Sequence, residues 1–236
     1  MKYSNVTQGE FQIRRNRFVA DVKIAGKTVA CHVKNTGRCQ ELLLPGCRAY
    51  CQHAESLNRK TAYTLLAVEK QGALVNLDSQ APNIVAVEWI QNGGLGWKPT
   101  VLRREVQFHD ARFDLYYERG TRRGFVEVKG VTLEQDGVAL FPDAPTARGA
   151  KHMRHLQMAI AEGYEATVLF VVQMAGVRKF CPNWPQDPVF CTALAAAVAS
   201  GVQVLAAECT VTPDSLRITN RIPVVLEVKD ADQPNG

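Results

Sequence analysis

The sequence predicts an α/β protein of two domains, a small β-barrel followed by a larger domain in which helices cover a mixed sheet. Two observations support this. Short β-like segments broken by turn residues follow one another from Glu10 to Asn76. Beyond residue 80, helical patterns alternate with strands, some of them continuously apolar. A chain of 236 residues that is 46% hydrophobic is long enough for both cores.

The first domain is expected to contain about five short strands, a number typical of a small barrel. The OB fold is the commonest barrel of this kind with a basic face that binds nucleic acid. We place the domain boundary near Ser79, so that 1–79 is the barrel, 80–229 the second domain and 230–236 a polar tail. The expected strands are 18–24, 28–33, 48–52, 61–69 and 73–76.

The second domain is expected to open with a helix over 81–91, its apolar side formed by Ile84, Val87 and Ile90 and its end set by Gly93 and Gly94. Strands follow at 105–109, 113–118, 124–128 and 138–141. A helix over 146–162 ends at Gly163, and a buried strand follows at 167–172. Asp187 and Pro188 begin another helix, which ends near residue 201 and precedes a strand at 202–206.

The distribution of charge favours binding to a polyanion. The formal charge is only +5, but the first 34 residues hold seven basic and two acidic side chains. The alternative is a solvated basic face. The basic residues of this segment are Lys2, Arg14, Arg15, Arg17, Lys23, Lys27 and Lys34.

The sequence indicates neither a membrane protein nor a secreted protein. No apolar run approaches the roughly 20 residues of a transmembrane helix, and the N-terminus lacks an apolar signal segment. Seven cysteines are an odd number without a disulfide pattern, which indicates reduced thiols and a cytoplasmic protein. Four neighbouring residues, Cys39, Cys47, Cys51 and His53, are numerous enough for zinc but lack a CxxC spacing, and the alternative is that the cysteines are buried as small apolar residues.

Acidic residues on two neighbouring strands predict a metal site. Asp114 lies thirteen residues before Glu127, and a hairpin through 119–123 would bring them side by side. Glu127 and Lys129 point to the same face of their strand. Two adjacent carboxylates repel each other unless a cation joins them, and oxygen ligands favour Mg²⁺ or Mn²⁺. Lys129 would then orient water or stabilise charge on a phosphate.

Spacing alone is weak support, because Asp214, Glu227 and Lys229 repeat it near the C-terminus. We prefer the first set, since Asp114 lies within a strand and the second set runs from a turn into the tail. The alternative for the first set is an ion-pair ladder on an exposed sheet face.

The helix expected at 146–162 carries basic residues beside this site. Arg148, His152 and His155 fall on one side, with Lys151 next to Arg148. A positive ridge beside an acidic metal site suits a phosphodiester. The alternative is a solvated polar face.

Four long motifs show a resemblance to a known family. The segments HVKNTGRCQELLLPG, RREVQFHDARFDLYY, FVEVKGVTL and FPDAPTARGAKHMRHLQMAIAEG resemble the sugar fermentation stimulation protein A family. The resemblance extends to about Val228. It implies an OB-like first domain and a second domain similar to PD-(D/E)xK nucleases, with Phe113 in place of the proline of that motif.

The resemblance also assigns residues. Its nuclease-like pattern falls on Asp114, Glu127 and Lys129, with Glu105 and Thr132 nearby, its NTG motif on Asn35, Thr36 and Gly37, and its basic helix on Arg148, Lys151 and His152. It implies DNA binding, a nuclease-like core and a link to the expression of sugar-utilisation genes.

Three functional hypotheses follow. The first is a DNA-binding nuclease in which Asp114, Glu127 and the Val128 carbonyl hold Mg²⁺ or Mn²⁺ and Lys129 positions water, with DNA bound by Arg14, Arg15, Arg17, Asn35, Thr36, Arg148, Lys151 and His152. The second is a DNA-binding regulator without catalysis. The third is action on RNA or single strands, with bases stacked on Phe18, Tyr50 or Tyr63.

Overall fold

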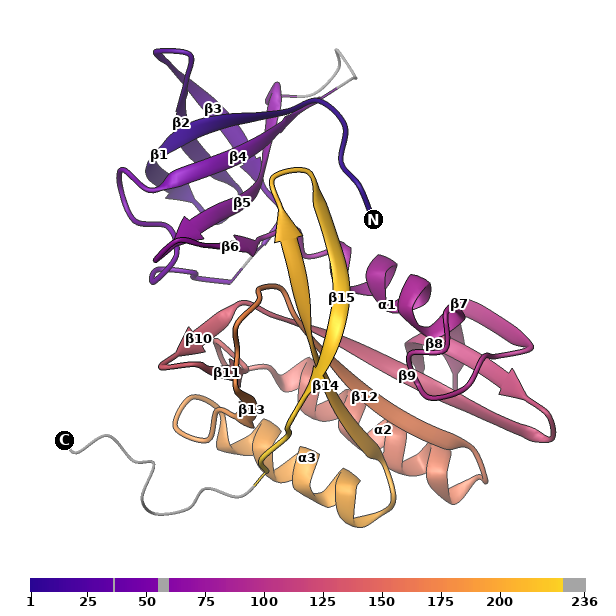
Figure 1. Ribbon diagram of the computed structural model, residues 1–236. Coiled ribbons are helices and arrows are strands. Elements are labelled where there is room, and N and C mark those ends of the chain that lie inside the picture. Colours follow the sequence, from indigo (N-terminus) through magenta and orange to yellow (C-terminus); the bar gives the residue numbers. More distant parts are fainter. Residues whose placement is uncertain (36, 55–59, 227–236) are drawn as a thin grey trace.

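The N-terminal part of the chain forms a closed barrel, which confirms the expected OB-like domain (Figure 1). The computed structural model describes residues 1–35, 37–54 and 60–226. Residues 31–33 pair in parallel with residues 63–65, and this pairing closes the barrel. A short sixth strand extends the edge of the sheet. The six strands are β1 (Val6–Asn16), β2 (Val19–Ile24), β3 (Lys27–Val33), β4 (Arg48–His53), β5 (Tyr63–Lys70) and β6 (Ala73–Asn76).

The first strand of the barrel is absent from the sequence-based prediction. β1 is eleven residues long, yet Phe11 is the one side chain in it that is fully buried. Gly9 takes a position where a Cβ would meet Val22 and Ile24, and the pairing with β2 is irregular between Phe11 and Ile13, so the alternating apolar pattern that reveals a strand is interrupted.

The second part of the chain contains a mixed sheet of six strands in the order β15-β14-β12-β9-β8-β7, as the α/β prediction requires. The three central strands are parallel, and the outer ones pair antiparallel. A small sheet, β10-β11-β13, lies beside it. The strands are β7 (Val101–Phe108), β8 (Ala111–Arg119), β9 (Arg122–Val131), β10 (Leu133–Gln135), β11 (Val138–Phe141), β12 (Glu165–Val172), β13 (Lys179–Pro182), β14 (Gln203–Thr212) and β15 (Ser215–Ile222).

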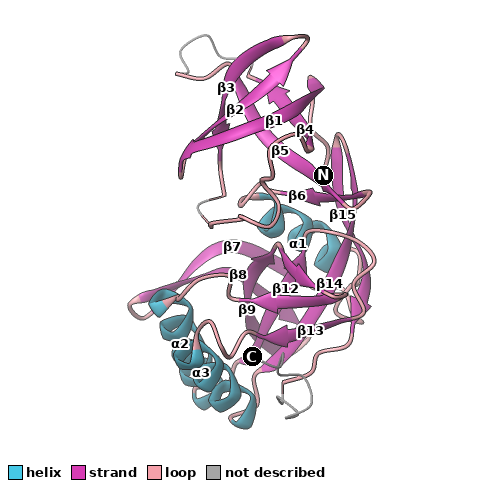
Figure 2. Ribbon diagram, turned by 90° about the vertical axis from the view of Figure 1, so that its left-hand side faces the viewer, coloured by secondary structure: helices cyan, strands magenta, loops and turns pink. Residues whose placement is uncertain are grey.

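Helices cover both faces of the large sheet (Figure 2). α1 (Ala81–Gln91) packs on one face against Leu115, Val126 and Leu169. α2 (Ala147–Ala161) and α3 (Pro188–Ala199) lie together on the opposite face. The bounds of α1 are those expected, but its fully buried side is formed by Ala81, Pro82, Val85, Ala86 and Ile90, while Ile84 and Val87 are half-buried.

One buried carboxylate fixes the start of both α2 and α3. Asp187 Oδ1 accepts a hydrogen bond from Phe190 N at 2.9 Å, which confirms Asp187 as the N-cap of α3. Its Oδ2 accepts a second bond from Thr146 N at 2.7 Å. Thr146 in turn caps α2, since its Oγ1 accepts from Gly149 N at 3.0 Å. The first turn of α2 therefore depends on a residue 41 positions further along the chain.

Buried polar contacts join the barrel to the second domain. Within the first domain, Lys34 Nζ lies 2.7 Å from Asp78 Oδ2, and the backbone carbonyl of Asp78 accepts a hydrogen bond from Gln173 of the second domain at 3.2 Å. Gln173, which follows β12, donates to Asn76 Oδ1 at 2.9 Å and to Asn76 O at 3.1 Å. These contacts hold the loop after β3 next to the end of β9, where the two domains share a pocket described below.

None of the helices within residues 1–35, 37–54 and 60–226 is long and apolar enough to cross a membrane.

Candidate metal and phosphodiester site

Asp114 lies where two strands separate. The pairing between β8 and β9 runs from Arg119 and Arg122 to Leu115 and Val126, and Asp114 is the next residue of β8. Its Oδ2 accepts a hydrogen bond from the backbone N–H of Val128 at 2.8 Å, and its Oδ1 accepts from Asn83 Nδ2 at 2.9 Å. The carboxylate is thus held in place between β9 and α1.

Glu127 is the most buried acidic residue of the site, with 2% of its side chain exposed. Lys129 Nζ lies 2.6 Å from Oε1, and His152 Nδ1 forms a hydrogen bond with the same oxygen. The other oxygen, Oε2, is also buried, and no donor from the described residues reaches it. Burying a carboxylate oxygen without a hydrogen-bond donor lowers the stability of the fold, and a bound cation would offset this loss.

His152 belongs to the acidic site and not to an exposed basic ridge, which corrects the expected orientation of α2. Its side chain is 11% exposed. Arg148 Nε lies 3.4 Å from His152 Nε2 and donates to it, so Nδ1 carries the proton that is shared with Glu127. The helix packs more of this face against the sheet than its polar composition indicates.

His155 is buried as well, and it binds the turn between β7 and β8. Its Nε2 lies 2.8 Å from Asp110 Oδ1, while Lys151 Nζ lies 2.7 Å from Asp110 Oδ2. Lys151 and His155 lower the pKa of the Asp110 carboxyl through these hydrogen bonds. Arg148 and Lys151 remain exposed, as a surface for phosphates requires.

The two carboxyl groups of the site have opposite pKa shifts. Burial raises the pKa of Asp114, and the nearby charge of Glu127 raises it further. Burial also acts to raise the pKa of Glu127, but the hydrogen bond from His152 and the charge of Lys129 outweigh it and lower that pKa.

Asparagine at position 114 should make the metal-free protein more stable at pH 7. Folding raises the pKa of Asp114, so the ionised carboxylate destabilises the fold above its folded-state pKa, and the penalty vanishes where both states are protonated. The amide keeps an oxygen for Val128 N, while Asn83 can turn its own amide to match. Urea unfolding in EDTA should show a gain for Asp114→Asn at pH 7 that disappears near pH 3. A less stable variant at pH 7 would contradict the argument.

The donor set is suited to a hard divalent cation. Asp114, the free oxygen of Glu127 and the Val128 carbonyl are all oxygen donors, the kind that Mg²⁺ and Mn²⁺ prefer. No cluster of three or more His, Cys, Asp or Glu side chains capable of holding a metal occurs in the part of the chain that the structure describes. A cation would therefore rely on two carboxylates, the main chain and water, as Mg²⁺ commonly does.

The cysteine cluster does not form a zinc site within the described residues. Cys51 Sγ lies 3.7 Å from Cys31 Sγ inside the barrel, and Cys47 Sγ contacts the carbonyl of Leu42 at 3.6 Å.

Glu105, the further acidic candidate, is 60% exposed and lies 3.5 Å from Arg112. Thr132 is buried at the end of β9.

The three arginines of the barrel have different roles. Arg14 donates hydrogen bonds to five backbone carbonyls, among them those of Asn35 at 2.7 Å and Gly37 at 2.6 Å, so it builds the loop after β3. Arg15 Nε lies 2.7 Å from Asp21 Oδ2, and the Arg17 guanidinium lies 5.7 Å from the Phe18 ring centre. Arg15 and Arg17 remain outside the core and accessible to a nucleic acid.

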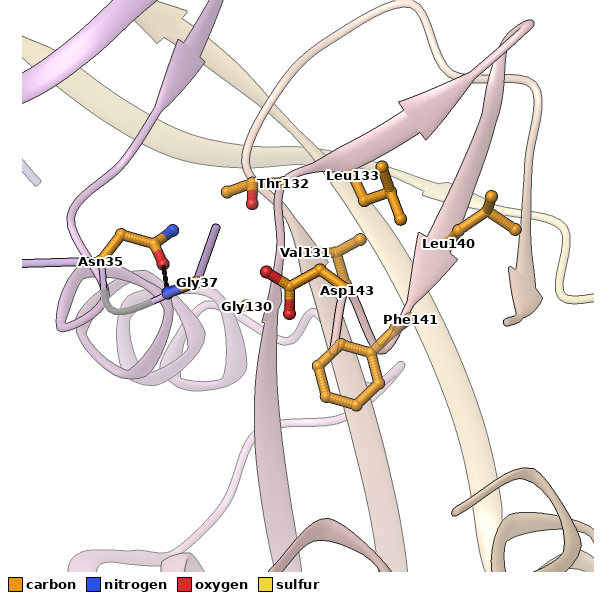
Figure 3. Close-up of a pocket in the computed structure, with 9 residues that line it drawn as sticks. All are labelled: Asn35, Gly37, Gly130, Val131, Thr132, Leu133, Leu140, Phe141 and Asp143. Carbon is orange, nitrogen blue, oxygen red and sulfur yellow. Dashed lines mark hydrogen bonds between the residues drawn. The ribbon is translucent and has the colours of Figure 1, made fainter. Parts of the chain in front are cut away.

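The loop after β3 lines a pocket of about 160 Å³ between the domains (Figure 3). Asn35 Oδ1 accepts a hydrogen bond from Gly37 N at 2.8 Å. Opposite this loop lie the end of β9 and the end of β11, with Thr132, Phe141 and Asp143. Thr36, which the sequence also assigned to nucleic-acid binding, lies outside the described residues, as do Glu227, Lys229 and the tail.

Three contacts at the candidate site and the pocket could not be found from the sequence. Asn83 is one polar residue in an apolar helix, and nothing in its spacing links it to Asp114. The contact of His152 with Glu127 requires the packing of α2 on β9. Asp143 lies in a Pro-rich loop, and its carboxylate lies where a side chain at position 37 would otherwise be.

The fold and the site together define a class of protein in which an OB-like barrel precedes a mixed-sheet domain that carries an Asp, Glu and Lys constellation. Residues 13–77 match the family model of the SfsA N-terminal OB domain, and residues 80–215 match that of the sugar fermentation stimulation protein RE domain. The chain belongs to the sugar fermentation stimulation protein family, as its motifs suggest.

Relatives of similar length support the assignment. A sugar fermentation stimulation protein homolog of Desulfitobacterium hafniense (strain Y51) is 50% identical over 226 residues, which cover 96% of this chain and 99% of the relative. The homolog of Clostridium beijerinckii is 45% identical over 226 residues, 96% of this chain and 100% of the relative. Among solved structures, Pyrococcus furiosus SfsA in complex with Ca²⁺ matches with a TM-score of 0.84 at 27% identity, covering 95% of this chain and 98% of that one.

Proposed function

We propose that this protein binds DNA and hydrolyses phosphodiester bonds at a site formed by Asp114, Glu127 and Lys129 with a divalent cation, in the cytoplasm. The observation that carries the proposal is the buried oxygen of Glu127 that has no donor, beside a second carboxylate whose pKa is raised. The Ca²⁺ in the complex of the related Pyrococcus furiosus protein supports the proposal that this protein also binds a divalent cation. The free thiols of all seven cysteines are typical of a reducing compartment.

The residues of the site have distinct tasks in this proposal. Asp114, Glu127 Oε2 and the Val128 carbonyl would hold Mg²⁺ or Mn²⁺, which when bound supplies Lewis-acid stabilisation of charge on a phosphate. His152 forms a hydrogen bond with Oε1 of Glu127, so Oε2 stays free to bind the cation. Lys129, whose side chain is 16% exposed, can release Glu127 to orient a water molecule or contact a phosphate oxygen.

DNA would lie along the exposed basic residues on both sides of the site. The barrel contributes Arg15 and Arg17, and α2 contributes Arg148 and Lys151. An OB barrel is a fold that commonly binds nucleic acids, and these arginines and lysines would contact phosphates. Arg14, by contrast, would act through the loop that it holds.

A second candidate is a DNA-binding regulator of sugar-utilisation genes without catalysis. One observation favours it: Lys129 pairs with Glu127 at 2.6 Å, which is what an ion pair of purely structural purpose would look like. The two functions differ in whether phosphodiester bonds are cut.

The deciding experiment measures binding and cleavage of labelled duplex, single-stranded and branched DNA, and of RNA. Each substrate is incubated with the protein in Mg²⁺, Mn²⁺ or EDTA. The nuclease proposal expects cleavage of at least one DNA substrate that requires the cation. Binding without cleavage in every condition would leave the regulator. Cleavage of RNA alone would contradict the choice of DNA as substrate.

The double variant Arg15→Ala, Arg17→Ala should weaken binding to all DNA sequences alike. Each lost phosphate contact lowers the slope of log K against log salt concentration by about one unit, because fewer counterions are released. Fluorescence anisotropy between low and moderate salt measures this slope. Lys27→Ala, an exposed barrel residue at the β2–β3 turn, is the matched control. An unchanged slope in the double variant would exclude these two arginines from the interface.

A further inference from the structure

We propose that the pocket between the barrel and the second domain receives one unpaired nucleobase that carries an exocyclic amino group. This inference rests on the DNA-binding part of the proposed function. The pocket takes its walls from three places far apart in the chain: the loop with Asn35 and Gly37, the segment Gly130 to Leu133, and the segment Leu140 to Asp143 (Figure 3).

The hydrogen-bonding groups of the pocket match the edge of such a base. The carboxylate of Asp143 is directed into the pocket, and no described residue donates a hydrogen bond or forms an ion pair with it. A carboxylate accepts from amino groups such as that of cytosine. Asn35 uses its Oδ1 for Gly37 N, so its Nδ2 stays available to donate to a ring nitrogen or carbonyl. In Figure 3 this amide and the hydroxyl of Thr132 face the same space as Asp143.

Charge and size exclude other parts of a nucleic acid. Asp143 is the one charged residue among those lining the pocket in the described chain, and its negative charge repels a phosphate. The volume of about 160 Å³ is well below the roughly 300 to 1,000 Å³ of pockets for drug-sized ligands. This volume suits a flat group the size of one nucleobase, and Phe141 in the wall offers an aromatic surface.

The pocket is built before any ligand arrives. Arg14 fixes the carbonyls of Asn35 and Gly37 with two of its hydrogen bonds. A Cβ atom at Gly37 would lie 2.3 Å from Asp143 Oδ2, so glycine lets the loop approach the carboxylate without displacing it. A preformed pocket loses little entropy when it binds.

The position of the pocket fits a base close to the cleavage site. Gly130 lines the pocket and directly follows Lys129 on β9, and Thr132 is three residues beyond Lys129. At about 3.3 Å per residue these three residues span about 10 Å, roughly three nucleotide steps of 3.4 Å. A strand whose phosphate lies at Asp114 and Glu127 would therefore present a base only a few nucleotides away.

The test measures affinity for duplexes that contain one unpaired A, C, G or T, and for the fully paired duplex, in EDTA so that no strand is cut. Wild-type protein should bind duplexes with unpaired A, C or G about tenfold more tightly than the duplex with unpaired T, which lacks an amino group. In Asp143→Asn this preference should fall to about twofold or less, with the affinity for the paired duplex unchanged. Asp136→Asn, an exposed aspartate of the same domain, is the control and should keep the preference.

Three results would overturn the proposal. If wild type binds all four unpaired duplexes equally and still binds paired DNA, the base pocket is wrong while DNA binding stands. If Asp143→Asn weakens binding to every duplex alike, Asp143 supports the structure and does not read a base. If no duplex is bound at all, the proposed DNA binding fails and the base pocket fails with it.

Discussion

Replacing Glu127 with glutamine is expected to weaken binding of Mn²⁺ by about 100-fold or more and to remove cation-dependent cleavage. Glutamine keeps an oxygen for Lys129 and His152 but loses the negative charge and the second acceptor oxygen, which is the one left without a donor in the structure. Changes in residues that merely support metal ligands already cost 10 to 100-fold, and a lost ligand costs more. Isothermal titration with Mn²⁺ measures the affinity directly.

Lys129→Ala should behave differently from Glu127→Gln. Since the lysine is not a ligand, cation binding should persist, while cleavage falls by a factor of about 100 or more through loss of charge stabilisation at the reacting phosphate. Asp214→Asn is the control, because Asp214 has the same spacing to a Glu and a Lys but lies in an exposed turn. Full Mn²⁺ affinity in Glu127→Gln would disprove the metal site.

Asp187→Ala is expected to lower the free energy of unfolding by about 3 kcal/mol. The substitution removes the acceptor of two backbone N–H groups, at Phe190 and Thr146, and each buried donor left unpaired costs about 1 to 3 kcal/mol. The N-cap of α3 is lost with it. Urea unfolding followed by circular dichroism measures the change.

Asparagine provides the control for this position. Asp187→Asn keeps one acceptor oxygen, so it should lose roughly half as much stability as Asp187→Ala. Because Thr146 begins the helix that carries Arg148 and His152, Asp187→Ala should also reduce DNA affinity. If Asp187→Ala unfolds at the same urea concentration as wild type, the double cap contributes nothing to stability.

The sequence predicts the two-domain fold well because the barrel and the central strands have clear local patterns. The helix over 81–91 and the strand at 138–141 have the bounds that were expected. β10 was missed because it is three residues long, and β13 because its four residues include Lys179 and Pro182, which depart from a strand pattern. β15 was missed because its apolar residues Leu216, Ile218 and Ile222 are interrupted by a bulge and by polar side chains.

The site could be predicted only as far as residue types and strand alternation allow. Asp114, Glu127 and Lys129 carry a local signal, since a short hairpin connects their strands. His152 and Asn83 contact these carboxylates from helices on opposite faces of the sheet, and no periodicity specifies which helix residue meets which strand residue. Asp143 depends on the placement of one domain against the other, which the sequence pattern does not encode.

The position of β9 limits where residues can be inserted or deleted in this family. It pairs with β8 on one side and β12 on the other, and it carries Glu127, Lys129 and the wall of the interdomain pocket. Because side chains alternate along a strand, one inserted or deleted residue would turn Glu127 toward α1 and Val126 or Val128 toward His152. Insertions and deletions among homologues should therefore collect in the turns around Gly120 and Gly137, and the length of β9 should stay constant.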